Sequence, residues 1–135
     1  MKRREAREQA FSLLFAKSIN HEKIKDIVTA ANEANDLPID DFAEAIAAGV
    51  ETHQKSLDEV IESFTRGWKV QRISKVSLSI LRLAVYEILY EKDIPTSVSI
   101  NEAVELAKKY GNSEDAPFVN GVLGSFAKKQ ESEHV

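Results

Sequence analysis

Hydrophobic residues recur every three or four positions along almost the whole chain, the spacing that places them on one face of an α-helix. No window shows the sustained alternation of apolar and polar residues that a half-buried strand would have. The pattern therefore predicts an all-α protein of about seven helices. Residues 76–89 contain so few polar side chains that neighbours must cover nearly the whole circumference, and we expect this segment to be the central helix.

Capping and turn signals divide the first half of the chain into four predicted helices. Asp40 is an N-cap residue for the third, and Ser56 and Glu59 have the spacing of a capping box that opens a fourth, ending near Gly67. The two helices before them are predicted at about 3–18 and 22–35.

The second half contains the central helix and two further predicted helices. Ser99 and Glu102 form a second capping-box spacing, which opens a helix that ends at Gly111, and a final helix is predicted at about 114–129. Trp68 lies where the two halves join and is interpreted as a core anchor, since large aromatics usually fill the corners between helices. We expect one domain over 1–135, with helical subgroups at about 1–67 and 68–130 and a frayed tail at 131–135.

The chain has 135 residues and 43% hydrophobic content, enough for a single core without covalent crosslinks. It has no cysteine, which excludes disulfides, thiolate metal sites and a cysteine nucleophile and fits a reducing compartment. The apolar runs are much shorter than a membrane span, and the charged N-terminus is not a signal peptide. We expect a soluble, cytoplasmic protein without membrane contact.

The net charge of −4 is distributed unevenly along the chain. Residues 1–25 carry seven basic and three acidic side chains, whereas residues 26–68 carry two basic and ten acidic ones. A protein that coats nucleic acid along its length would be basic overall. The distribution predicts one local contact with nucleic acid and an acidic segment that faces solvent or a basic protein partner.

The start of the chain is the strongest candidate for that contact. At 100° per residue, Arg3, Arg4 and Arg7 fall on one side of the first two helical turns. Arginine binds phosphate through two parallel hydrogen bonds and also stacks on bases, while positive charge in a first turn opposes the helix dipole. The other interpretation is a solvated basic end without a binding role.

The sequence contains no recognisable catalytic or metal-binding motif. His21, His53 and His134 are far apart, and none has a close helical partner for a metal ion. No phosphate-binding glycine loop, dinucleotide fingerprint or nucleophile elbow is present. We therefore expect a protein that is not an enzyme and needs no cofactor or metal.

Four segments resemble the NusB family of bacterial transcription antitermination factors. The last two of these segments are the most specific, because they contain residues that are unusual inside helices, namely Asn101, Glu102, Asn120 and Gly121. Capping and a close helix crossing at Gly121 would also explain these residues. The segments follow the family's order along the chain. They are RREAR at 3–7, ILRLAVYEI at 80–88, SINEAVELAKKYG at 99–111 and FVNGVL at 118–123.

The resemblance implies a fold of two three-helix groups around a shared core and a function in suppressing premature transcription termination. It implies binding to single-stranded boxA RNA of ribosomal RNA transcripts together with the ribosomal small-subunit protein NusE, and assembly with other Nus factors on RNA polymerase. Because similar folds serve other roles, a helical protein-interaction module without an RNA function is the alternative. Monomer and homodimer both remain open.

The resemblance also assigns roles to individual residues. For Phe15 and Phe118, plain core packing is an equal alternative to RNA contact, and Ser77 stands where some relatives carry an acidic partner residue. The RNA-binding assignments are Lys2, Arg3, Arg4, Arg7, Phe15, Glu114, Asp115 and Phe118. The assignments to the protein partner are Lys75, Ser77 and Arg82.

Overall fold

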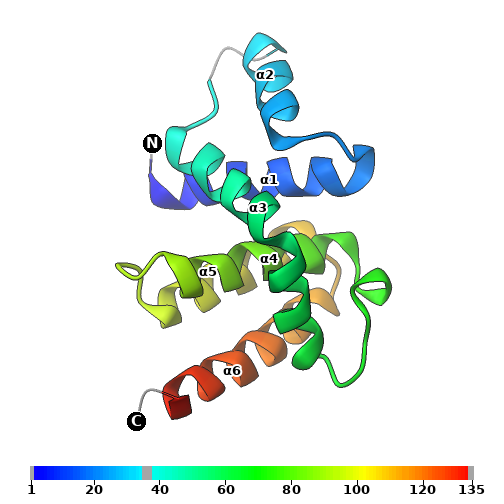
Figure 1. Ribbon diagram of the computed structural model, residues 1–135, viewed down its shortest axis with the longest axis vertical. Coiled ribbons are helices and arrows are strands. Elements are labelled where there is room, and N and C mark those ends of the chain that lie inside the picture. The colour runs from blue at the N-terminus through cyan, green and yellow to red at the C-terminus, as the bar shows by residue number, and fades with distance from the viewer. Residues whose placement is uncertain (1, 35–37, 134–135) are drawn as a thin grey trace.

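The computed structural model describes residues 2–34 and 38–133, and this part of the chain is helical without strands (Figure 1). The all-α prediction is confirmed. Six α-helices and one short 3-10 helix follow one another in the described residues. They are α1 (Arg3–Asn20), α2 (Ile24–Ala34), α3 (Asp41–Ser63), η1 (Val70–Arg72), α4 (Lys75–Tyr90), α5 (Thr96–Tyr110) and α6 (Asp115–Glu133).

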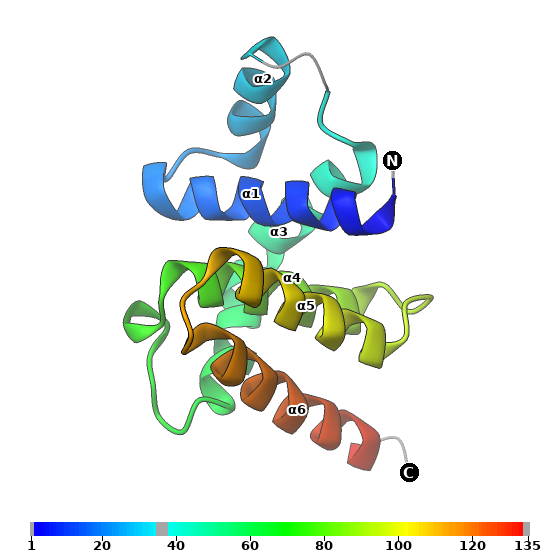
Figure 2. The ribbon, with the colours of Figure 1, turned by 180° about the vertical axis from the view of Figure 1, so that it is seen from behind.

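The helices form two groups of three, as predicted. Figure 1 shows α1 and α2 in the upper half and α4, α5 and α6 in the lower half, while the long α3 descends from the first group across α4. From behind, α5 lies below α1 (Figure 2). Buried side chains from all six helices form one cluster, with the apolar α4 at its centre.

The predicted third and fourth helices are one continuous helix, α3. Leu57 and Ile61 extend the buried stripe that begins with Ile46 and Val50, so packing favours an unbroken helix. The Ser56 hydroxyl donates to the carbonyl of His53 within the helix instead of capping a new one. The predicted count of seven is therefore wrong by one helix.

The capping box predicted at Ser99 and Glu102 is also wrong. The helix begins three residues earlier, at Thr96, after Pro95 in extended conformation. Ser99 is buried inside the helix, and its hydroxyl donates to the carboxylate of Glu87 at 3.2 Å. The Ser99 hydroxyl thus donates a hydrogen bond to a buried carboxylate instead of capping the backbone N–H groups at the start of the helix.

Three further expectations differ from the structure. Trp68 is 54% exposed and is not a core anchor, because Arg66 and Gly67, both with positive φ, turn the chain outward after α3. No side chain lies near Gly121, so it marks no close helix crossing. The last helix continues to Glu133, through part of the tail predicted to fray, and residues 134 and 135 lie outside the described range.

Candidate functional site

The N-terminal end of α1 presents a cluster of cations. Lys2, Arg3 and Arg4 are exposed, and α1 starts without a side-chain cap. The Arg3 guanidinium lies over the Phe42 ring, 3.7 Å from its centroid. The Arg4 Nε donates to Glu102 at 3.0 Å, with the arginine side chain still 66% exposed. These three residues keep donors available to an anionic ligand, and we call them the cationic end.

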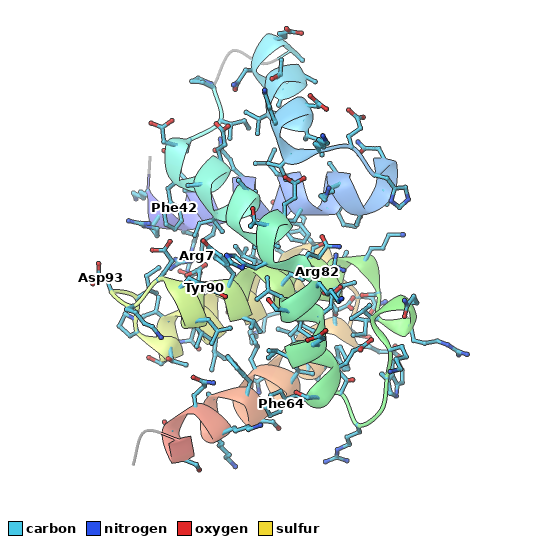
Figure 3. The ribbon with its side chains drawn as sticks, in the orientation of Figure 1. Arg7, Phe42, Phe64, Arg82, Tyr90 and Asp93 are labelled. Carbon is cyan, nitrogen blue, oxygen red and sulfur yellow. The ribbon has the colours of Figure 1, made fainter. Side chains whose placement is uncertain are left out.

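Arg7 differs from the other arginines because it is buried. Only 4% of the residue is exposed, and its Nε and Nη2 donate to the two carboxylate oxygens of Glu87 at 2.9 and 3.0 Å. Arg7 lies on the side of α1 that carries Ala10 and Leu14 into the core, facing α4 (Figure 3). The expectation that three arginines project together is therefore wrong for Arg7.

Glu87, the buried partner of Arg7, is a residue of the site that the sequence did not predict. It is 2% exposed and accepts hydrogen bonds from both Arg7 and Ser99, which joins α1, α4 and α5. A single carboxylate near the end of an otherwise apolar helix is the signal that could have identified it, since such a buried charge requires a cationic partner.

Charged groups of both signs line the edge between α1 and α5. Glu8 accepts from Lys109 at 2.9 Å and from the Tyr110 hydroxyl at 3.0 Å. The hydrogen bond from Lys109 lowers the pKa of Glu8, against the opposing effect of burial. A pocket of about 310 Å³ lies along this edge, lined by Arg4, Arg7, Glu8, Glu102, Glu105, Leu106 and Lys109.

Phe15 and Phe118 are both half-buried, so each ring packs on the core and also reaches the surface. Phe15 stacks on Phe11 with 5.9 Å between centroids, and Phe11 stacks on Tyr110 of α5 at 5.0 Å. Phe118 lies 6.1 Å from the exposed Trp68. Trp68 is therefore an aromatic residue at the surface, which its interpretation as a core residue did not predict. Its position in a connection, outside any periodic apolar stripe, is the feature of the sequence that could have indicated exposure.

Asp115 and Ser77 lie in a buried junction between α4 and α6. Asp115 accepts from the hydroxyls of Ser77 at 2.6 Å and Ser74 at 2.7 Å, and from the Asn112 N–H at 2.9 Å. Burial acts to raise the pKa of Asp115, but these hydrogen bonds outweigh it and the pKa is lowered. Both side chains are buried and bonded to each other, so in this structure neither is exposed for direct contact with a ligand. Glu114 beside them is exposed.

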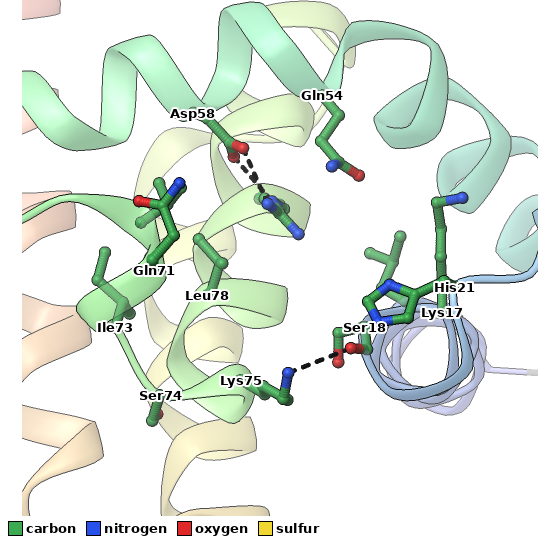
Figure 4. A pocket seen from close by; sticks show the side chains of 13 residues that line it. Lys17, Ser18, His21, Gln54, Asp58, Gln71, Ile73, Ser74, Lys75 and Leu78 are labelled. Atoms are coloured by element: carbon green, nitrogen blue, oxygen red, sulfur yellow. Dashed lines mark hydrogen bonds and ion pairs between the residues drawn. The ribbon is translucent and has the colours of Figure 1, made fainter.

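A larger cleft of about 680 Å³ opens where α1, α3 and α4 meet (Figure 4). Two of the predicted partner residues, Lys75 and Arg82, line it. Arg82 donates to both carboxylate oxygens of Asp58 at 2.8 Å, and Lys75 donates to the Ser18 carbonyl at 3.3 Å. The structure brings Lys75 and Arg82 together and separates them from Ser77.

The cationic end presents donors that suit the binding of an anionic ligand. Within residues 2–34 and 38–133, no group of three or more His, Asp or Glu side chains could hold a metal ion. No helix in the same part of the chain has the length and apolar content needed to cross a membrane. Exposed guanidinium groups and partly exposed aromatic rings are the kinds of side chain that bind unpaired nucleotides, and at the cationic end Arg3 lies over the half-buried Phe42 ring.

Comparisons with known proteins agree with this geometry. The model of the NusB family matches residues 4–128. A transcription antitermination protein NusB from Clostridium acetobutylicum is 44% identical over 133 residues, covering 97% of this chain and 98% of the relative. The corresponding protein of Natranaerobius thermophilus is 42% identical over 132 residues, covering 94% and 95%.

Solved structures give the same result. The T. maritima NusB structure matches with a TM-score of 0.84 and 34% identity, covering 100% of this chain and 99% of that one. A crystal structure of the antitermination factors NusB and NusE in complex with dsRNA matches with a TM-score of 0.83 and 26% identity, covering 94% and 96%. The chain belongs to the NusB family.

Proposed function

We propose that this protein is a transcription antitermination factor that binds single-stranded boxA RNA together with NusE and suppresses premature termination. It acts in the cytoplasm by binding, without catalysing a reaction, and joins other Nus factors on RNA polymerase. The observation that carries the proposal is the exposed cationic end of α1, where the Arg3 guanidinium lies over the half-buried Phe42 ring. Relatives named as NusB antitermination proteins, and a related complex that contains NusE and RNA, support it.

In this proposal the cationic end binds RNA phosphates. Phe42 holds the Arg3 guanidinium flat, so the edge of the fork remains free to donate two hydrogen bonds to one phosphate. Arg4 exchanges its contact with Glu102 for a phosphate oxygen. Arg7 contributes by position: its buried pair with Glu87 fixes the first two turns of α1 on α4 and α5.

Aromatic rings provide stacking for the bases. Phe118 and Trp68 lie 6.1 Å apart at the start of α6, and Phe15 stands on α1. Stacking on one such ring contributes about 1–3 kcal/mol per base. Glu114, exposed at the same helix start, is a candidate acceptor for base amino groups. Asp115 acts indirectly, by holding this start against α4.

The cleft lined by Lys75 and Arg82 is the proposed site for NusE. Both cations are held by groups of this chain, and both oxygens of the Asp58 carboxylate already accept from Arg82, so a partner would enter the cleft beside this ion pair. A basic partner would supply the electrostatic attraction to RNA that a chain of net charge −4 lacks. RNA affinity should therefore rise at least about tenfold, or about 1.4 kcal/mol, when NusE is added.

The test is a fluorescence titration of a boxA-like strand and a scrambled strand at fixed salt, with and without NusE. The Arg3→Ala/Arg4→Ala variant should lose most RNA binding and keep its helicity and NusE binding. Lys25→Ala/Lys128→Ala removes the same charge from exposed positions on α2 and α6 and should bind RNA normally.

Unchanged RNA binding by the arginine variant would favour the alternative of a protein-interaction module. That alternative draws its support from the open cleft between α1, α3 and α4, which exists whether or not RNA binds. NusE binding without any gain in RNA affinity would favour the same alternative.

A further inference from the structure

Three aromatic rings gather on the face that α3 and α4 share, and none of them lines the cleft proposed for NusE. His53 of α3 stacks on Tyr90 of α4 with 4.7 Å between centroids and 19° between planes. Tyr86 lies 4.9 Å from Tyr90 and 6.2 Å from His53. We call these three residues the aromatic patch. Tyr90 is 47% exposed, so the patch opens to solvent.

Gly49 makes room for the patch. A Cβ at this position of α3 would collide with the hydroxyl and ring of Tyr86, so only glycine lets this ring lie against the helix backbone. The hydroxyl of Tyr86 is thereby directed toward α3 and its ring is fixed beside Tyr90. The patch is consequently a packed surface and not a chance approach of mobile side chains.

The electrostatic surroundings of the patch are negative. The helix α4 ends at Tyr90, and its last turn contains no basic residue to offset the partial negative charge of a helix C-terminus. Glu91 follows as the C-cap. Burial raises the pKa of Tyr86, and the Glu91 charge raises it further, which places this carboxylate within electrostatic reach of the ring. Lys92 is followed by another carboxylate, that of Asp93.

A cation is the ligand that fits these features together. Ring faces, a carboxylate and a helix C-terminus each attract positive charge, and a guanidinium can also stack on tyrosine. The Arg3 and Phe42 pair, at 3.7 Å, already shows such a contact elsewhere in this molecule. An RNA strand fits less well, because its phosphates would meet Glu91 and the end of α4.

We propose that the aromatic patch docks an arginine side chain of a basic protein segment. The contact lies at the opposite end of α4 from Lys75, so it is separate from the cleft proposed for NusE, and in Figure 3 both Tyr90 and Asp93 lie to the left of Arg82. It does not depend on RNA binding. The acidic segment 26–68, which carries ten acidic and two basic residues, supplies long-range attraction for such a partner.

The probe is a labelled peptide of four Arg-Gly repeats, compared with the same peptide carrying neutral citrulline in place of arginine. In anisotropy titrations at low salt, the arginine peptide should bind and the citrulline peptide should not. Tyr90→Leu and Glu91→Gln should each weaken binding about two- to fivefold, the range of an exposed cation–π contact or of a surface ion pair. NMR shifts on peptide addition should concentrate on His53, Tyr86 and Tyr90.

Two variants serve as matched controls. Tyr110→Leu removes another exposed tyrosine whose neighbouring carboxylate, Glu8, is already paired with Lys109, and it should leave peptide binding unchanged. Glu131→Gln removes one charge from α6 and should also have no effect. Equal losses in the controls, or binding of the citrulline peptide, would overturn the proposal. So would a Tyr90→Leu variant that loses only binding to an oligouridine strand, since the patch would then take bases.

Discussion

Arg7 and Glu87 illustrate how a single buried charge determines where the neighbouring side chains point. Both residues are almost completely removed from water, and the two parallel hydrogen bonds between them compensate for the lost hydration. Arg4, one position after Arg3 and three before Arg7, remains outside and reaches Glu102. The pair thus separates an arginine that holds α1 in place from those that remain available for a ligand.

Removing the charge of Glu87 should strongly destabilise the protein. The variant Glu87→Gln leaves the buried Arg7 guanidinium with only the more distant Glu102 carboxylate, 3.9 Å away, as a counter-charge, and loss of the close buried partner costs about 3–5 kcal/mol. Urea unfolding followed by circular dichroism measures the change. The double variant Arg7→Met/Glu87→Leu, which removes both charges, should recover most of the loss. A loss below about 1 kcal/mol in Glu87→Gln would show that the pair is not buried in solution.

In the proposed complex Glu102 would compete with RNA for Arg4, so its neutralisation should strengthen RNA binding. Exposed ion pairs contribute about 0.2–1 kcal/mol, and the variant Glu102→Gln should accordingly raise affinity for a boxA-like strand by about two- to fivefold. The matched control is Glu105→Gln, whose partner is Lys108 and not an arginine of the cationic end. If both variants gain the same RNA affinity, the loss of one negative charge, and not the release of Arg4, explains the effect.

At the scale of elements, helical periodicity predicted most of the fold. The apolar stripes located all six helices, and the central helix was placed within one residue at each end. The capping boxes failed because Ser56 and Ser99 lie inside helices, where their hydroxyls meet a carbonyl and a buried carboxylate. The residue spacing within one segment cannot predict such contacts, since Ser99 and Glu87 meet only through the packing of two helices.

The candidate site was predictable only where its residues are local in sequence. The resemblance placed the arginines, but a helical wheel of α1 alone does not show that Arg7 faces a carboxylate 80 positions away. Asp115 and Ser77 were assigned to two separate ligands although they bond to each other. Their pairing depends on how α6 crosses the start of α4, which is a property of tertiary packing.

The junction between α4 and α6 should make stability depend on pH. The pKa of Asp115 is lowered in the folded protein, so its contribution is present above its ordinary value of 3.8 and is lost as pH falls through the lowered value. Near neutral pH, Asp115→Asn should lose about 1.5–3 kcal/mol, the value of a hydrogen bond to a charged group. Unfolding titrations across acidic pH should show the difference from wild type shrinking. A difference that is independent of pH would contradict this assignment.

At the scale of the whole molecule, charge is divided between regions that would serve different ligands. The first 25 residues are basic, whereas residues 26–68, which contain α3 with His53 of the aromatic patch, are strongly acidic. An acidic body limits nonspecific attraction to nucleic acid, so the proposed RNA contact would be confined to the small cationic end. The same acidic body attracts basic proteins. One charge distribution therefore accounts for both proposed protein contacts, the NusE cleft and the aromatic patch, and for the local RNA contact.

This division predicts a shallow dependence of RNA affinity on salt. Each phosphate neutralised on a single strand contributes about −0.7 to the slope of log affinity against log salt, so Lys2, Arg3 and Arg4 together give a slope of about −2. Titrations of a boxA-like strand over a salt series measure it. The Arg3→Ala/Arg4→Ala variant should retain a slope of about −0.7, and added NusE should steepen the wild-type slope, because a basic partner brings further phosphate contacts. A wild-type slope much steeper than about −2 without NusE, or one that persists in the arginine variant, would mean that RNA follows other cations of the surface.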